Sequence, residues 1–526
     1  IDGWGTYDTH AGPSNLQNGI DNKVYGVLGY SGFKGSIFGE EYEFRQGVYR
    51  FDPTLKNFEF LTNTTNNTWG LGITEDNSIF ASTANNNHSV FMGIPNKNFR
   101  DIDGITMQGS LKIDGHYDIK PITPNIRQVD VFGGFTAAAG HHFYNARNYP
   151  SKYWNKVAFV CEPTGGLVHI SQIEKEGAGY IEKDGGNLFA SSDEWVSPVE
   201  AKVGPDGYIW VADWYNFIVQ HNPTPTEAFG GYDAEKGKGN AYVNPLRDKS
   251  RGRIWRIVPK TGKGHNSIVL NQNNPQELIK ALSNDNMFWR LTAQRLLVER
   301  GNTDVLTDLY KLVNNLKVDE QGLNPGALHA IWTIQGLEEL ESEKEATAVV
   351  IGALFHTSSA VRKAAIQILP RTSWVDDALL KSGVLQDKDP SVQKEALLYF
   401  SEREPSENIG KILYKLSKEK KVRKDKWLSQ SMYAAGTKHI KGFIEAYLNA
   451  NPNFKAPSEK LTDKKNTVLN GDELAETLVK TYIGKVEIAD KISGNLTKTS
   501  TVINIKTIKN DMKYDVTEFV VEAGKS

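Results

Sequence analysis

The spacing of apolar residues divides the chain into two parts. Up to about residue 260 they form short runs of β-branched and aromatic residues that alternate with polar ones and are separated by Gly and Asn. This pattern predicts short strands joined by tight turns. From about residue 270 to 450 the apolar residues recur at helical spacing instead. The sequence therefore predicts a β domain over 1–260 and an α-helical domain over 270–450.

A repeated turn pattern indicates how the strands are organised. Each copy reads Asp, then Asn or Gly, any residue, a β-branched residue and an aromatic one, and the copies are Asp21–Tyr25, Asp76–Phe80 and Asp206–Trp210. Asp-Asn and Asp-Gly pairs suit tight hairpin turns. Runs 48–53 and 254–259 also resemble each other and are expected as third or outer strands. At about 40–50 residues per blade, the region holds roughly four or five blades of a β-propeller that is incomplete at its N-terminal end.

The helical domain carries a repeat of its own. Asn274-Pro-Gln-Glu277 has the features of a helix start, with an N-cap residue, Pro at the first position and Glu three residues after the cap. Apolar or small residues then recur at i, i+4 and i+8 in units 31 to 37 residues apart: Trp289/Ala293/Leu297, Gly326/Ala330/Ile334, Val361/Ala365/Leu369 and Val392/Ala396/Phe400. The spacing predicts a HEAT-like solenoid in which the small residue lets two helices pack closely.

The last quarter of the sequence has a different character. Residues 451–484 are largely polar, with a weakly helical stretch near their end, and are expected as a linker. Residues 485–526 contain two strand-like runs, Val502–Lys506 and Val516–Val521. We interpret them as the start of a further β domain, in a sequence truncated at both ends.

Composition and charge exclude several classes of function. With 61 basic and 63 acidic residues the net charge is −2, which gives no field to attract nucleic acid or anionic lipid. No run of 18 apolar residues is present, so no transmembrane segment is predicted. Cys161 is the only cysteine, which excludes an intramolecular disulfide, a CxxC zinc site and covalent CxxCH haem attachment within this chain.

Several segments together resemble the large membrane-bound dehydrogenase family of environmental bacteria. They are Asp8–Leu16, Gly29–Phe33, Ser82–Asn87, Glu194–Val199, Gly204–Gly207, Ala212–Asn216 and Arg247–Arg256. The resemblance implies a glucose/sorbosone dehydrogenase-like propeller, as in soluble quinoprotein glucose dehydrogenases, then HEAT repeats and usually a c-type cytochrome. Some members insert an azurin-like (cupredoxin) copper domain, whose first strands residues 510–524 resemble. It further implies a bacterial protein of the periplasm or cell surface.

The resemblance also suggests a catalytic base. In soluble quinoprotein glucose dehydrogenases a histidine in a His…Leu…Gly-x-Asp motif is the general base beside pyrroloquinoline quinone. His10…Leu16…Gly19-Ile-Asp21 is similar, with one residue more between His and Leu. Histidine suits the role because it can accept an alcohol proton near neutral pH. The alternative is a structural histidine at the start of a blade.

Candidate cofactor residues follow from the same resemblance. The family places an Arg-Asn pair before a Gly-Leu strand and holds calcium under the quinone with two later backbone carbonyls. Asn67 matches the Asn of that pair, Asn66 replaces the Arg, and Asn85 and Asn86 stand at the carbonyl positions, so these asparagines are candidate cofactor and calcium ligands. Asn-rich turns are the alternative explanation.

Other residues argue for and against this chemistry. Ser197 and Val199 stand where the family carries arginines that bind the quinone carboxylates, and this weighs against a bound quinone. His141 and His142 follow a segment that resembles the family's loop into a central-channel strand, and at most one of two neighbours in such a strand faces the channel. They are candidate substrate residues, as are Asp213 and Trp214, which could hydrogen-bond and stack on a sugar; the alternative in both cases is structural packing.

Two functions are therefore expected. The first is an oxidoreductase whose propeller oxidises a sugar or polyol and passes electrons to a redox partner, such as copper or haem domains outside this sequence. The second is a non-catalytic propeller that binds glycans or proteins, with the solenoid as a scaffold. Propellers host many unrelated functions, so the fold alone does not decide between them.

Overall fold

The computed structural model divides the chain into two compact units, residues 1–484 and 485–526, which we describe separately. It describes residues 1–8, 10–85, 87–100, 102–126, 128, 131–219, 235, 243–244, 247–248, 250–260, 268–338, 340, 344–455, 468–485, 501–509 and 512–521, the last two ranges as backbone only.

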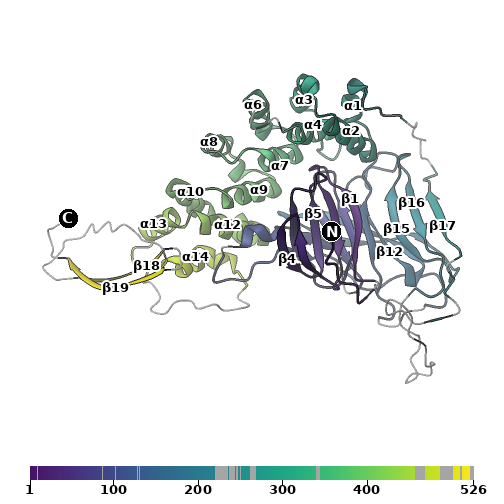
Figure 1. The fold of residues 1–526 in the computed structure, drawn as a ribbon, viewed down its shortest axis with the longest axis horizontal. Coiled ribbons are helices and arrows are strands. Elements are labelled where there is room, and N and C mark those ends of the chain that lie inside the picture. Colours follow the sequence, from purple (N-terminus) through teal and green to yellow (C-terminus); the bar gives the residue numbers. More distant parts are fainter. Residues whose placement is uncertain are drawn as a thin grey trace. The chain divides into compact units, whose positions relative to one another are not determined.

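Four antiparallel sheets in chain order form the β region of the first unit (Figure 1). We call them blades 1 to 4. Blade 1 contains β1 (Pro13–Asn18), β2 (Val24–Leu28), β5 (Gly47–Phe51) and β6 (Phe58–Asn63), with the hairpin of β3 (Phe33–Ile37) and β4 (Glu40–Phe44) inserted. Blade 2 contains β7 (Thr68–Ile73), β8 (Ile79–Thr83), β9 (Val90–Met92) and β10 (Ser110–Lys112). Blade 3 contains β11 (Ala139–Phe143), β12 (Val157–Glu162), β13 (Leu167–Glu176) and β14 (Gly179–Ala190). In blade 4 the described strands are β15 (Pro198–Val203), β16 (Ile209–Asp213) and β17 (Arg253–Ile257).

The first strands of neighbouring blades lie against each other, as in a propeller. Strand β7 packs on β11, and β11 packs on β15. The approach is so close that a Cβ atom on Gly70 would lie 1.5 Å from the Gly140 carbonyl oxygen. Glycine is therefore required where the inner strands of blades 2 and 3 meet. These features confirm the predicted propeller-like architecture.

The repeated turn pattern is confirmed. Asp21, Asp76 and Asp206 each lie in the hairpin between the first and second strands of their blades. The residue after each Asp has a left-handed backbone, with φ of 59° at Asn22, 59° at Asn77 and 75° at Gly207. This conformation explains why the pattern requires Asn or Gly at that position. The similar runs 48–53 and 254–259 contain β5 and β17, which are both third strands.

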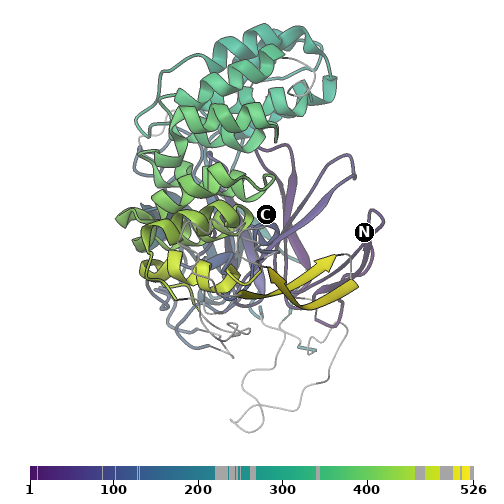
Figure 2. The same cartoon turned by 90° about the vertical axis from the view of Figure 1, so that its left-hand side faces the viewer.

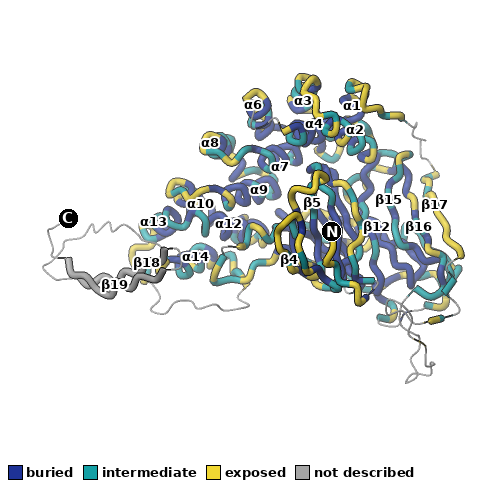
Figure 3. Tube along the Cα trace, in the orientation of Figure 1, coloured by how far each residue is buried: buried dark blue, intermediate teal, exposed yellow. Residues whose placement is uncertain are grey.

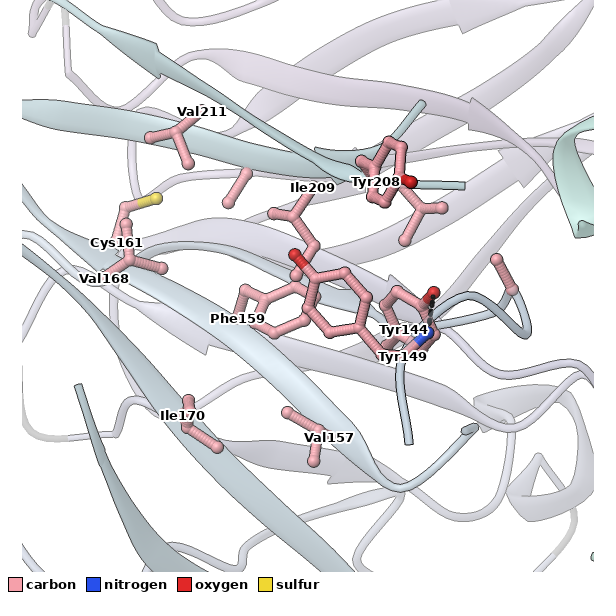
Figure 4. Close-up of a cluster of buried hydrophobic side chains, with 13 residues drawn as sticks. Tyr144, Tyr149, Val157, Phe159, Cys161, Val168, Ile170, Tyr208, Ile209 and Val211 are labelled. Carbon is pink, nitrogen blue, oxygen red and sulfur yellow. Dashed lines mark hydrogen bonds between the residues drawn. The ribbon is translucent and has the colours of Figure 1, made fainter. Parts of the chain in front are cut away.

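A hydrophobic core fills the space between blades 3 and 4 (Figure 4). Its fully buried members include Phe159 and Cys161 on β12, Val168 on β13, and Ile209 and Val211 on β16. Burial raises the pKa of the Cys161 thiol well above its usual value, so this cysteine is a packed, un-ionised side chain.

Paired helices follow the sheets and form the predicted α-helical region. They are α1 (Pro275–Ala281), α2 (Met287–Arg300), α3 (Leu306–Val313), α4 (Pro325–Gly336), α6 (Lys344–Gly352), α7 (Ser359–Ile368), α8 (Ser373–Ser382), α9 (Pro390–Ser401), α10 (Glu407–Ser417), α11 (Lys420–Lys424), α12 (Lys426–Lys438) and α13 (Ile440–Ala450). Helices α2, α4, α7, α9 and α12 pack on one another in succession, and Figure 3 shows them as the more buried row. The repeat alanines Ala293, Ala330, Ala365 and Ala396 are all fully buried, as the repeat register predicts.

This inner row of helices covers the turn end of the blades, so that the helical region lies along the sheets (Figures 1 and 2). Asn22 donates to the Trp332 carbonyl in α4 at 2.8 Å. In the next blade, Lys363 of α7 contacts Asp76 at 3.0 Å. At the fourth blade, Trp289 of α2 donates to the Pro205 carbonyl at 2.8 Å. All three Asp-containing turns are thus in contact with the solenoid.

The C-terminal segments contain the elements expected of them. The weakly helical stretch near the end of 451–484 forms helix α14 (Leu474–Tyr482), which packs on α12 and α13 through buried apolar residues such as Leu478. In the second unit, β18 (Thr501–Lys509) and β19 (Met512–Val521) form an antiparallel pair that includes both predicted strand runs. None of the described helices combines the length and the apolar character needed to cross a bilayer.

Candidate functional site

A small cavity lies among the loops at the uncovered end of blades 1 and 2. We call it the loop pocket; its volume is about 90 Å³, and its lining residues are Asp8, His10, Tyr30, Asn66, Asn67, Trp69, Ala84, Asn85, Thr136, Ala137 and Val219. Asn67 precedes the first residue of β7, whereas Asp76 follows its last. The strand's six residues span about 20 Å, so the loop pocket and the solenoid lie at opposite ends of it.

A buried carboxylate holds one histidine of the loop pocket. Asp8 is 4% exposed and accepts the backbone N–H of His10 at 2.9 Å. Its Oδ1 atom lies 3.8 Å from His10 Nδ1, and its Oδ2 atom accepts a hydrogen bond from the Tyr30 hydroxyl. The imidazole itself is partly buried, and the Asp8 carboxylate lies on its Nδ1 side at more than hydrogen-bond distance, so a small shift would let Asp8 orient the ring with Nε2 towards the pocket.

Asn67 and Trp69 fix the backbone around this histidine. Asn67 accepts from the Tyr30 N–H at 3.2 Å and donates to the His10 carbonyl at 3.3 Å. The Trp69 indole donates to the same carbonyl at 2.5 Å. Both functional groups of the Asn67 amide are thus hydrogen-bonded within the protein, so Asn67 holds the wall of the pocket in place. The ring of Trp69 forms a rigid apolar part of that wall.

The structure brings some of the sequence-predicted residues together and separates the others. His10, Asn67 and Asn85 line the loop pocket, whereas Asn86 lies outside the described residues. His141 and His142 are on β11 and do not line it. His141 is fully buried, bonded to the Ser89 hydroxyl at 2.7 Å, and burial lowers its pKa to about 3.

The predicted Asp213–Trp214 pair lies at the end of β16 in blade 4. Asp213 is 3% exposed and accepts the backbone N–H groups of Ser197 and Tyr215, both at 2.8 Å, and the Trp255 indole N–H at 2.9 Å. Its carboxylate is therefore engaged in closing the blade, which is the structural alternative considered above. Trp214 is 40% exposed and does not line the loop pocket.

The loop pocket does not fit pyrroloquinoline quinone. Its described lining contains no cationic side chain for the quinone carboxylates, and Asp8 adds a negative charge. Ser197, at a position where an arginine was expected, is buried and donates to the Asn216 carbonyl at 2.8 Å. The Asn85 carbonyl accepts from the Thr83 hydroxyl at 2.6 Å. Calcium at Asn85 and Asn86 stays a prediction, and we derive no chemistry through the quinone.

A second polar group, which the sequence analysis missed, lies between blades 2 and 3. We call it the histidine cluster: His88 from the β8–β9 loop, His116 after β10, His169 on β13 and Glu182 on β14. One ligand atom from each residue lies within 4.8 Å of the others. Burial lowers the pKa of His88 to about 4, so its imidazole is neutral at pH 7 and has a free lone pair.

No sequence motif could have revealed this cluster. Its residues are separated by irregular intervals and belong to two different blades. Only the packing of β13 and β14 beside the blade 2 loops brings them together. The abundance of histidines before residue 266 was the one available signal, and it did not indicate which of them meet.

The histidine cluster and the loop pocket share a wall. The Phe135 ring stacks on His88 with a centroid distance of 4.2 Å. The next two residues, Thr136 and Ala137, line the loop pocket and donate their backbone N–H groups to Glu162 at 3.0 and 2.9 Å. Burial raises the pKa of Glu162 to about 7.

Comparisons with known proteins give a distant fold likeness. A crystal structure of a glucose dehydrogenase is 14% identical, with 39% of this chain and 80% of that chain covered and a TM-score of 0.23. A putative oxidoreductase (glucose dehydrogenase) of Thermus thermophilus is 11% identical, with 47% and 84% covered and a TM-score of 0.24. A further glucose dehydrogenase is 13% identical, with 39% and 79% covered and a TM-score of 0.20. No curated protein matches the chain. Residues 1–261, which contain all four blades, match the family described as domain of unknown function DUF7133.

Proposed function

We propose that the propeller acts on a sugar or polyol at the loop pocket. The observation that carries this proposal is the meeting of the Asp8–His10 pair with the Trp69 ring in one cavity. Sugars present apolar C–H faces that pack on aromatic rings and hydroxyl groups that need hydrogen-bond partners. A volume of about 90 Å³ is below the roughly 300–1,000 Å³ of pockets that enclose a whole ligand. The site therefore suits the end of a glycan or one face of a sugar ring.

In the catalytic form of this proposal, His10 accepts the proton of a substrate hydroxyl, with Asp8 on the Nδ1 side of the imidazole. The adjacent C–H bond then breaks as the carbonyl forms, its proton passing to water and its two electrons, one at a time, to a redox partner such as a copper or haem domain outside this sequence. The chain would then be an oxidoreductase of the bacterial periplasm or cell surface. In the alternative form the propeller binds a glycan without oxidising it, and the solenoid is a scaffold. The position of the Asp8 carboxylate on the Nδ1 side of His10 favours the first form, since binding alone does not require an acid–base pair.

The binding step can be tested with the full chain. A glycan array identifies a ligand, and calorimetry then compares the unmodified protein with Trp69→Ala and with Trp374→Ala, which removes a half-exposed ring of α8. We expect Trp69→Ala to weaken binding at least tenfold, or about 1.4 kcal/mol, and Trp374→Ala to leave it unchanged. Equal affinities of the two variants, or no sugar or polyol bound at all, would refute the proposal.

The catalytic step needs a separate measurement. Dye-linked oxidation of the bound sugar should be lost in His10→Ala while the affinity measured by calorimetry stays within a few-fold. Oxidation that survives this change would remove His10 as the base. Binding without oxidation in the unmodified protein would contradict the catalytic form of the proposal and support the glycan-binding form.

A further inference from the structure

The histidine cluster has the dimensions of a tetrahedral metal site. Glu182 Oε1 lies 3.6 Å from His88 Nε2, 3.6 Å from His116 Nε2 and 3.5 Å from His169 Nε2. His116 Nε2 and His169 Nε2 are 3.3 Å apart. An ion with bonds of about 2.0–2.1 Å to four tetrahedral ligands separates those ligands by about 3.3–3.4 Å. Four of the six separations among the ligand atoms are within about 0.3 Å of this value. The other two, from His88 Nε2 to the other imidazole nitrogens, are no longer than 4.8 Å, so binding an ion needs a small inward shift of His88.

Two of the four central atoms lack a hydrogen-bond partner, whereas His116 Nε2 and His169 Nε2 contact each other. His88 Nε2 and Glu182 Oε1 are buried and make no hydrogen bond within the described residues. Their side chains are 1% and 0% exposed, so bulk water does not replace the missing bonds. Separations of 3.5–3.6 Å are too long for hydrogen bonds between them. A cation at the centre of the cluster would satisfy both atoms at once.

The outer sides of the imidazoles face oxygen atoms. His88 Nδ1 lies 3.4 Å from Asp114 Oδ2, and His169 Nδ1 lies 3.9 Å from Asp184 Oδ1. For the third imidazole, His116 Nδ1 is 3.2 Å from the Asp118 carbonyl oxygen. Only the His116 contact is a hydrogen bond, and it lets that ring keep its proton on Nδ1 and direct Nε2 inward. Carboxylate oxygens lie on the Nδ1 side of the other two rings, which favours the same orientation.

The remaining carboxylate oxygen of the cluster is also held. Glu182 Oε2 accepts the backbone N–H of Gly115 at 3.1 Å, one residue before His116. This bond leaves Oε1 as the atom directed to the three imidazoles. This hydrogen bond links the loop after β10 to β14 without the help of an ion.

We propose that His88, His116, His169 and Glu182 bind one divalent first-row transition ion, of which zinc fits best, and that this ion ties blade 2 to blade 3. Three imidazoles and one carboxylate select such ions over calcium and magnesium, which take mainly oxygen ligands. Four protein ligands complete a tetrahedral shell, as in structural sites. The proposal does not depend on sugar binding at the loop pocket.

The metal content of the full chain tests the proposal. The protein is purified without a histidine tag, passed over a weak chelator and assayed by inductively coupled plasma mass spectrometry. We expect about one ion per chain. His116→Ala removes the most exposed ligand, at 22%, so it should fold while losing at least nine-tenths of the metal. Glu182→Gln should lose metal too, whereas Glu174→Gln, a half-exposed carboxylate on β13 of the same sheet, should keep it.

Cobalt replacement tests the geometry. Cobalt(II) bound to the metal-free chain should give the intense visible absorption of a tetrahedral site, which His116→Ala should lack. Strong chelation should lower the melting temperature, and zinc but not magnesium should restore it. Folded protein that retains no ion, or equal metal in His116→Ala and the unmodified chain, would overturn the site. Weak octahedral cobalt bands would overturn the closed, structural role.

Discussion

The two ends of the propeller blades are built from different chemistry. At the turn end, the solenoid buries ion pairs: Arg290 is fully buried and its Nη2 atom lies 2.6 Å from Glu75, which is 2% exposed. At the loop end, Asp8 and His10 stand at a small open pocket and the ring of Trp69 forms one wall. Charges that are buried and paired constrain the structure strongly, whereas partly exposed ones remain available to a ligand. The difference indicates that buried, paired charges are concentrated at the turn end, whereas the loop end presents polar groups to a small cavity.

The strongest test of this contrast is Glu75→Gln. Glu75 binds both Arg290 and Arg147, whose Nη1 atom lies 2.7 Å from it. The change would leave a fully buried guanidinium without its carboxylate, so we expect the free energy of unfolding to fall by about 3–5 kcal/mol. Denaturant titration of the full chain measures this, with Glu174→Gln as an exposed control. A loss below about 1 kcal/mol would mean that the covered end is not the stabilising one.

A pH profile tests the loop end. Burial raises the pKa of Glu162 to about 7, so the folded protein holds a proton that the unfolded chain releases above about pH 4.5. The contribution of Glu162 to the free energy of unfolding should therefore be fully present below about pH 4.5 and fall by about 2–3 kcal/mol as the pH rises to about 7. Glu162→Gln should flatten this part of the profile measured by denaturant titration. An unchanged slope in the variant would assign the dependence to other groups.

Overpacking the solenoid tests how firmly it covers the turn end. Ala365 is fully buried in α7, the helix that also carries Lys363 to Asp76. Ala365→Leu should lower the free energy of unfolding by about 1–3 kcal/mol because neighbouring helices must move apart. Thermal unfolding followed by circular dichroism measures the change. The surface substitution Lys381→Leu in α8 serves as the control, and equal effects of both would reject the repeat register.

The smallest effect on stability is expected at His10. Its carbonyl group, not its side chain, receives the hydrogen bonds of Asn67 and Trp69. His10→Ala should therefore change the free energy of unfolding by no more than about 0.5 kcal/mol. Denaturant titration can detect a larger loss, which would show that the loop end also contributes to stability.

Local features could be predicted from the sequence, whereas long-range ones could not. The Asp-Asn and Asp-Gly turns require only neighbouring residues, and the repeat alanines follow helical spacing, so both were found. Arg290 directly follows the first residue of a repeat unit, Trp289, but its partner Glu75 is 215 residues away in the sequence. The histidine cluster could not be predicted for the same reason, because its four residues meet only after two blades have packed.

The same separation orders events during synthesis. Glu75 and its turn leave the ribosome 215 residues before Arg290, which at about 5–20 residues per second is a delay of roughly 10–40 s. Throughout that interval the acidic turn of the nascent chain is exposed to water. The speed of translation over residues 75–290, mostly blades 2 to 4, thus sets how long incomplete propellers can associate wrongly, and slow codons in this interval should lower the yield of folded protein.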